Sequence, residues 1–207
     1  MAVIKSGSST DQWTIDPTNA GRVTLYDANG NLLSPLATRR STANVLVRQS
    51  AATAAGATVW AIRNPYSNIV ISILNIYLQL SFDGTGTNVL MRYELIKGTG
   101  CTAMSGGVSV TPLIKRTSIG QSNAEIRVLD TGLTLTGVTF GSAFHTMTWG
   151  RMSASTSVQA PSPQHRLDCS KYPIELDQNE ILAIRNGPTN NSVIGDTILG
   201  SVEFVEG

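Results

Sequence analysis

Two histidines, His145 and His165, are the side chains of this sequence best suited to proton transfer or metal binding near neutral pH. His145 lies in the alternating stretch FHTMTW, where a histidine on one strand face is expected to be structural. His165 follows the Pro-rich stretch APSPQ and is expected in a surface loop, beside Arg166 and Asp168. The chain has no G-x-S-x-G, H-E-x-x-H, phosphate-loop or dinucleotide fingerprint, so neither histidine gains a catalytic context.

Cys101 and Cys169 are the only cysteines of the chain. Two thiols without a nearby pair of histidines do not form a zinc site, and they do not suggest a disulfide framework. We therefore expect two free cysteines, as is usual in a reducing compartment.

The carboxylates are scattered along the sequence. Asp83 and Asp130 stand at glycine-containing turns, where turn stabilisation is expected and a calcium site is the alternative. Glu175, Asp177 and Glu180 cluster in the stretch IELDQNEI, which resembles a solvated hairpin tip more than a paired acid and base. The sequence thus predicts no enzymatic activity, no catalytic residues, no metal site and no cofactor.

The composition indicates a protein with a neutral surface. Charged residues make up only 14% of the 207 residues, hydrophobic residues make up 41%, and the net charge is +1. The surface must therefore be covered by Ser, Thr, Asn and Gly, which is common in β-rich proteins that use their surface for assembly. No field of one sign is available to attract nucleic acid or an anionic membrane, so neither is expected as a direct partner.

The sequence also predicts no membrane span. The longest apolar-rich stretch, residues 68–82, is too short and too polar to cross a bilayer. The first residues, MAVIKSGSS, lack an apolar run of signal-peptide length. We therefore expect the protein to be made and assembled in a cytoplasm.

The positions that could contact a partner must be held by β-strands, because period-two alternation recurs and helical periodicity is almost absent. Residues 58–207 contain roughly eight to ten strand candidates with turn signals between them, which predicts an antiparallel jelly-roll sandwich. Within residues 68–82 the apolar face switches near Leu74, which predicts a β-bulge or sheet corner. The expected core residues are Trp60, Ile71, Leu95, Ile126, Leu135, Ile184 and Val202.

Residues 1–57 are expected to form an extended N-terminal arm with short strands. Such a segment cannot bury its own apolar side chains, but it can do so by adding a strand to a neighbouring protein or by lying in its groove. The adjacent arginines of this segment favour an ion-pair contact with a protein partner over nucleic acid, since no aromatic residues are interleaved with them. The candidate partner-binding residues are Trp13, Ile15, Arg22, Val23, Leu25, Tyr26, Arg39 and Arg40.

The N-terminal stretch resembles a leader found on virion proteins of tailed bacteriophages. Such leaders pair a TDxxxxDP piece with an ARVTLYDxxG strand. The matching positions here are Thr10-Asp11, Asp16-Pro17, residues 22–27 and Gly30, with Gly21 in place of Ala. The stretches VWAIRNPYS, IYLQLSFDGTGT, RYELIKGTG and LAIRNGPTNN are similar to the jelly-roll domains of phage head decoration (cement) proteins and related fibre proteins.

This resemblance implies a phage virion structural protein. The main role that it implies is that of a capsid decoration protein, which is located on the head surface, clamps subunits of the major capsid protein and stabilises the head. The resemblance also supplies the expectation of a homotrimer, because such decoration proteins commonly form trimers. The alternative is a tail, neck or head-fibre component, acting as an adaptor or as a receptor- or glycan-binding module. A lectin-like module outside viruses is a third possibility.

Overall fold

The computed structural model describes the chain in nine stretches, and strands account for all of its regular structure there. No helix that could span a membrane occurs in these stretches. A short antiparallel hairpin of β1 (Ala2–Lys5) and β2 (Gln12–Ile15) comes first along the chain. The described residues are 2–5, 12–15, 39–50, 53–82, 89–114, 121–129, 131–151, 164–187 and 196–207.

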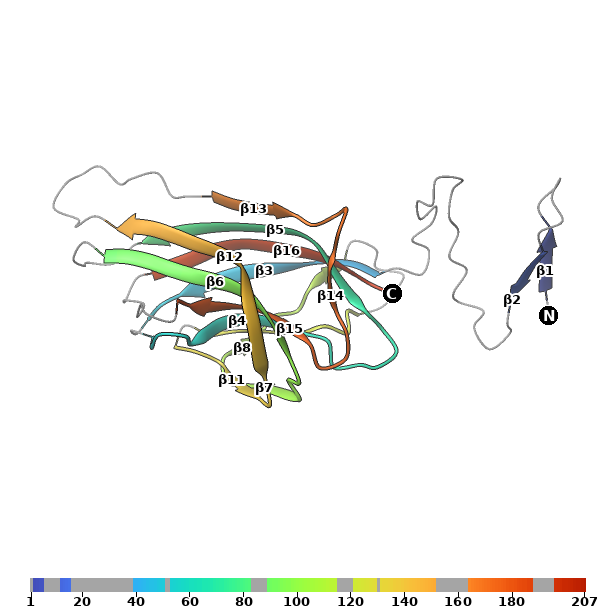
Figure 1. Ribbon diagram of the computed structural model, residues 1–207, viewed down its shortest axis with the longest axis horizontal. Coiled ribbons are helices and arrows are strands. Elements are labelled where there is room, and N and C mark those ends of the chain that lie inside the picture. The colour runs from blue at the N-terminus through green and yellow to red at the C-terminus, as the bar shows by residue number, and fades with distance from the viewer. Residues whose placement is uncertain are drawn as a thin grey trace.

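Two antiparallel sheets face each other in the body of the protein (Figure 1). We call one of them the front sheet, which has the order β13 (Gln164–Asp168), β5 (Ile71–Phe82), β16 (Asp196–Glu206), β3 (Arg39–Arg48) and β9 (Leu113–Ile114). Strand β14 (Ile174–Leu176) also pairs with β5. We call the other the back sheet, which has the order β12 (Thr139–Arg151), β6 (Val89–Thr99), β15 (Ile181–Asn186), β4 (Thr58–Arg63), β10 (Glu125–Val128) and β8 (Val108–Ser109). The predicted all-β antiparallel sandwich is therefore confirmed.

The eight main strands wind between the sheets in a regular way. In chain order they are β3, β4, β5, β6, β12, β13, β15 and β16. The first and the last of them, β3 and β16, are neighbours in the front sheet, while the second and the seventh, β4 and β15, are neighbours in the back sheet. This nesting is compatible with the predicted jelly roll, in which eight strands alternate between two packed sheets.

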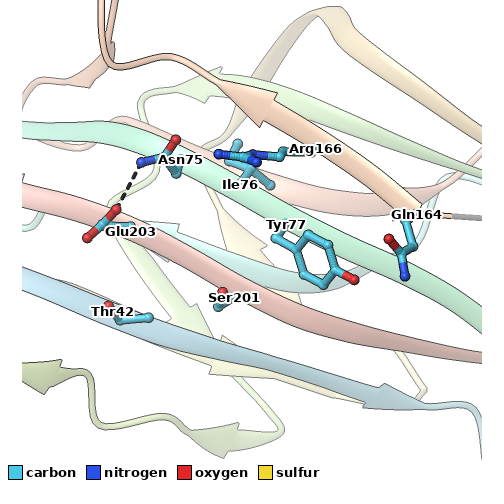
Figure 2. A pocket seen from close by; sticks show the side chains of 8 residues that line it. All are labelled: Thr42, Asn75, Ile76, Tyr77, Gln164, Arg166, Ser201 and Glu203. Atoms are coloured by element: carbon cyan, nitrogen blue, oxygen red, sulfur yellow. Dashed lines mark hydrogen bonds between the residues drawn. The ribbon is translucent and has the colours of Figure 1, made fainter.

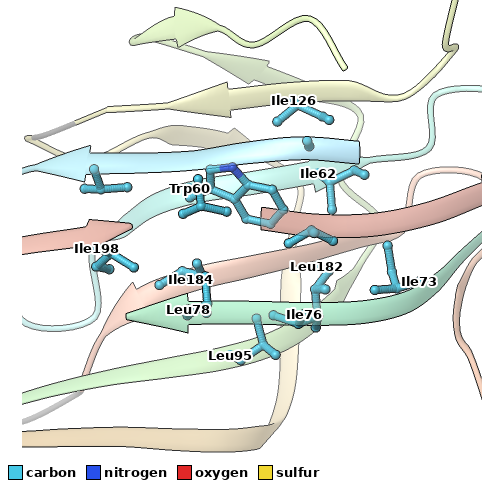
Figure 3. Packing of buried hydrophobic residues seen from close by; sticks show 14 of the residues in the cluster. Trp60, Ile62, Ile73, Ile76, Leu78, Leu95, Ile126, Leu182, Ile184 and Ile198 are labelled. Carbon is cyan, nitrogen blue, oxygen red and sulfur yellow. The ribbon is translucent and has the colours of Figure 1, made fainter. Parts of the chain in front are cut away.

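The main core fills the space between the two sheets (Figure 3). Alternate residues of the front sheet, such as Val45, Ile76 and Val202, meet Trp60 and Leu95 of the back sheet. Period-two alternation produces this layer, because every second side chain of each strand points at the opposite sheet. Six of the seven predicted core residues are buried as expected: Trp60, Ile71, Leu95, Ile126, Ile184 and Val202.

A smaller apolar cluster covers the outer face of the back sheet. Its centre consists of Ala61, Ile96 and Ile181, and the two-stranded sheet of β7 (Ala103–Ser105) and β11 (Thr134–Thr136) lies against it. Strand β4 is consequently buried along its whole length. Leu135, expected in the main core, is instead half-buried in β11 and packs on this second cluster.

The predicted β-bulge near Leu74 is confirmed. Before it, Ile71 and Ile73 are buried, and after it Ile76 and Leu78 are buried, so the inward parity changes by one residue. The register of β5 with β16 shifts at the same place, which leaves Leu74 without an opposing residue. The bulge lets one strand bury apolar side chains on both sides of a bend.

The sandwich begins earlier in the chain than expected. Strand β3 falls inside the segment predicted to be an arm, yet it pairs with β16 over ten consecutive residues and also pairs with β9. Ala43, Val45 and Val47 of β3 are fully or almost fully buried. The predicted boundary at residue 57 is therefore wrong, because the alternation NVLVRQS marks a strand of the front sheet.

Candidate functional site

The outer face of the front sheet brings together polar side chains that are far apart in the sequence. Strand register places Arg166 beside Tyr77, and Tyr77 beside Ser201. The neighbouring row places Asn75 beside Glu203, and Glu203 beside Thr42. These residues come from four adjacent strands, β13, β5, β16 and β3, and they share the side of the sheet that faces away from the core.

These rows form a shallow groove of about 620 Å³, called the front groove below (Figure 2). The amide of Asn75 donates a hydrogen bond of 2.9 Å to the Glu203 carboxylate. Tyr77 lies between these groups and Gln164 with 38% of its surface exposed. The lining residues are Thr42, Asn75, Ile76, Tyr77, Gln164, Arg166, Ser201 and Glu203.

A second, smaller groove lies on the back sheet, beside an irregular part of β12. The register of β12 with β6 shifts twice between Phe140 and His145, and Phe144 is left half exposed there. This groove encloses about 380 Å³ and includes Lys97 and Glu180 among its lining residues. These two residues form an ion pair with 2.6 Å between Nζ and Oε2, so their charges neutralise each other.

The two histidines lie against each other, which the sequence analysis did not foresee. His165 is in strand β13, not in the expected loop, and it is half-buried. Its Nδ1 is 3.1 Å from Nε2 of His145 in β12, and the rings are edge-on. Because β12 and β13 are edge strands of opposite sheets, this hydrogen bond joins the two sheets at one open side of the sandwich.

Burial, and secondarily the neighbouring His145, lowers the pKa of His165 below its usual value. Nε2 of His165 is buried and has no hydrogen-bond partner among the described residues, so a proton there would be unpaired. When both rings are neutral, the tautomer that avoids an unpaired proton on Nε2 of His165 has Nδ1 of His165 donating to Nε2 of His145. No group of three or more metal-ligating side chains occurs within the described stretches.

Acidification is expected to destabilise the sandwich through this pair. Since the folded pKa of His165 lies below that of the unfolded chain, the unfolded state binds more protons between the two values. The free energy of unfolding should therefore fall as the pH drops from about 6.5 towards the lowered pKa. Thermal denaturation of the wild type and His165→Gln across this range measures the effect. An equal pH dependence of the two proteins would contradict it.

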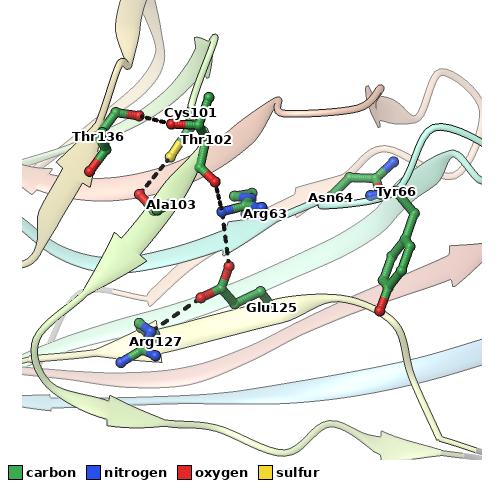
Figure 4. A network of polar contacts seen from close by, with 9 residues as sticks. All are labelled: Arg63, Asn64, Tyr66, Cys101, Thr102, Ala103, Glu125, Arg127 and Thr136. Carbon is green, nitrogen blue, oxygen red and sulfur yellow. Dashed lines mark hydrogen bonds and ion pairs between the residues drawn. The ribbon is translucent and has the colours of Figure 1, made fainter.

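Charged side chains elsewhere on the back sheet have structural partners (Figure 4). Arg63 donates a 2.7 Å hydrogen bond to the Thr102 carbonyl and lies 3.2 Å from the Glu125 carboxylate. Arg127 reaches the same carboxylate at 3.3 Å and also donates to the Gly106 carbonyl. This network fastens the chain around residues 102–106 to β4 and β10, so its charges are committed to the fold.

Glu94 is a buried carboxylate with a structural role. It lies between Arg92, at 3.1 Å, and Arg185, at 2.9 Å, and its side chain is 6% exposed.

Glu180, expected at a solvated hairpin tip, instead accepts a hydrogen bond from the Asp177 backbone N–H. The expectation was wrong for Glu180 because Lys97 of β6 reaches it. Asp83 and Asp130 lie outside the described residues.

Both cysteines are free thiols. Burial raises the pKa of Cys101 and, together with the charge of Asp168, that of Cys169. A thiol with a raised pKa is mostly protonated at neutral pH and is a poor nucleophile. The arrangement around both residues is therefore that of packed side chains.

The candidate partner-binding residues of the arm are only partly placed. Trp13 and Ile15 belong to β2, where their backbones pair with Ile4 and Ala2. Arg39 and Arg40 open β3, and their backbones pair with Glu206 and Val205. The two arginines thus begin the front sheet instead of lying in an arm. Arg22, Val23, Leu25 and Tyr26 lie outside the described residues.

The comparisons with known proteins add no relative: no family model, curated protein or solved structure matches this chain. Its functional assignment therefore rests on its own residues and geometry.

Proposed function

We propose that the chain is a virion structural protein of a tailed bacteriophage that decorates the head and holds neighbouring subunits of the major capsid protein together. The observation that carries this proposal is that the first strand of the sandwich follows the leader in the chain. The leader-like residues 10–30 precede β3, which begins at Arg39 and lies between β16 and β9 in the front sheet. A partner that binds the leader is therefore linked through the chain to a strand of the sandwich.

This connection suits a mechanical role. A pull on the leader acts on β3, whose ladder with β16 spans ten residue pairs and whose inward side chains are buried. Many backbone hydrogen bonds then share the load. A clamp of this kind resists separation of capsid subunits under the pressure of packaged DNA, and it needs no catalytic residue.

Self-association into a homotrimer on the head surface is part of the proposal. The low charge content leaves neutral surfaces for contacts between subunits. A closed cyclic arrangement buries such surfaces without open-ended growth. Each contact needs roughly 1,000 Å² of buried surface to be stable. Light scattering is expected to give three times the 22.0 kDa mass of the chain. A monomer at working concentrations would reject the trimer but leave head binding to be judged separately.

The mechanical role predicts that the protein protects heads against heat. DNA-filled heads assembled without it should release their DNA at a lower temperature than decorated heads, because fewer contacts oppose the internal pressure. Dye access to released DNA during a temperature ramp measures this, and adding back the purified protein should restore the higher temperature. Equal release temperatures with and without the protein would reject the clamp.

The front groove gives one specific reason to retain the fibre alternative. A polar groove with an exposed tyrosine on a rigid sheet is a suitable surface for a host glycan. A tail, neck or head-fibre component with such a groove would act as an adaptor or in attachment to the host, and it would be present in few copies. The number of copies per virion separates the two roles.

A further inference from the structure

We propose that the front groove is a binding site for a neutral saccharide. The inference deepens the fibre alternative, which also uses this groove, and it does not rest on head decoration, because it concerns the outer face of the front sheet and uses none of the leader residues. A decoration protein and a fibre protein could both carry such a site. The two proposals can therefore fail independently.

The groove recognises its ligand through side chains, because the backbone beneath it is occupied. Its floor is formed by β5 and β16, which are interior strands with ladder partners on both sides. An extended peptide that added itself as a strand would need a free sheet edge, which this floor does not offer. The occupant must instead present many hydrogen-bonding groups and an apolar patch to a flat surface.

The lining matches the hydroxyl groups of a sugar. Glu203 provides carboxylate oxygens that accept hydrogen bonds, and the amide of Gln164 can both donate and accept. Arg166 adds planar N–H donors from the edge strand, and Ser201 adds a small hydroxyl that leaves room above it. A polyol, whose hydroxyls are donors and acceptors at once, satisfies this mixed set better than an apolar ligand does.

Tyr77 supplies the apolar surface. Tyr77 lies between these polar groups with 38% of its surface exposed, so the C–H face of a sugar ring can pack on its ring (Figure 2). Tyrosine combines a flat apolar face with a polar tip, and few of its torsions must be frozen on binding. Leu199 and Leu46 are exposed in the next row of the same face and extend the apolar surface.

Charge argues for a neutral ligand. The groove lining contains one guanidinium, from Arg166, and one carboxylate, from Glu203, so the two formal charges cancel. Asp168 of the same strand as Arg166 lies in register with Asn75, and hydrogen bonds from Ser170 lower its pKa and keep it ionised. A phosphate or another anion would meet these carboxylates, whereas an uncharged sugar would not.

Isothermal titration of the full-length protein with maltose, cellobiose, lactose and chitobiose tests the site. At least one of these disaccharides is expected to bind in the millimolar range or more tightly. Tyr77→Ala and Glu203→Gln should each weaken that binding by at least about tenfold, through loss of the packing surface and of a charged acceptor. Tyr66→Ala, which removes another exposed tyrosine outside the groove, should leave it unchanged.

Other outcomes would overturn the inference. Failure of all four sugars to bind the wild type would reject a neutral saccharide site. Binding of glucose 6-phosphate alone would replace it with an anion site at Arg166. Loss of sugar binding in Phe144→Ala, with Tyr77→Ala unaffected, would move the site to the groove of the back sheet. Thermal denaturation of each variant confirms that the sandwich is intact, since the substituted side chains are partly exposed.

Discussion

Deletion of residues 1–36 is expected to abolish binding to phage heads while leaving a folded, soluble β-sandwich. The deletion stops short of β3, which begins at Arg39 and contributes Ala43, Val45 and Val47 to the core. The removed segment contains Trp13 and Leu25, apolar residues that the proposed function assigns to a capsid partner. Co-sedimentation of the truncated protein with undecorated heads measures binding, and thermal denaturation measures folding.

A matched pair of substitutions separates anchoring from general loss of apolar surface. Trp13→Ser in the full-length chain should weaken head binding, since it removes a large anchor from the leader. Tyr172→Ser removes an aromatic side chain that is 78% exposed on the sandwich, and it should leave head binding unchanged. Full occupancy of heads by the truncated protein would show that the leader is not the anchor.

Gly200→Ala is expected to cause the largest loss of stability of any small substitution in the front sheet. A Cβ at this position of β16 would lie 1.9 Å from the Tyr77 carbonyl oxygen, and the backbone has a φ of +154°. Neither strand can move aside easily, because β16 is paired on both sides. Overpacking and backbone strain together should lower the free energy of unfolding by about 3 kcal/mol or more.

Chemical denaturation of Gly200→Ala measures this loss, with Gly141→Ala as the control. Gly141 lies in edge strand β12, where an added Cβ would be 3.8 Å from the nearest atom, the Lys97 carbonyl oxygen. This variant should remain within about 0.5 kcal/mol of the wild type, or differ by the strand preference of alanine alone. Similar stabilities of the two variants would contradict the close approach of β16 and β5 at Gly200.

Local sequence patterns predicted the strands and much of the core, because alternation is written into neighbouring residues. The switch of apolar parity around Leu74 even located the bulge in β5. The same reasoning failed at Gln164–Asp168, where Leu167 is the single apolar residue of a short edge strand and gives almost no alternation signal. It also failed to place β3 in the sandwich, because the strand that pairs with β3 over its whole length, β16, lies at the other end of the chain.

The candidate sites could not be predicted, since they depend on pairings between distant parts of the chain. The front groove requires Tyr77, Arg166 and Ser201 to be neighbours, and only the register of β13, β5 and β16 makes them so. The contact between His145 and His165 likewise needs two edge strands of opposite sheets to meet. The local sequence around each residue does not indicate which distant strand will lie beside it.

The number of copies per virion tests the proposed decoration role most directly. Quantitative mass spectrometry of purified particles, calibrated against the major capsid protein, gives this number. Head decoration predicts hundreds of copies in a simple ratio to the major capsid protein, because a symmetric lattice repeats each binding position many times. A dozen copies or fewer, found with the tail or neck proteins after the particles are dissected, would contradict decoration and support the fibre alternative.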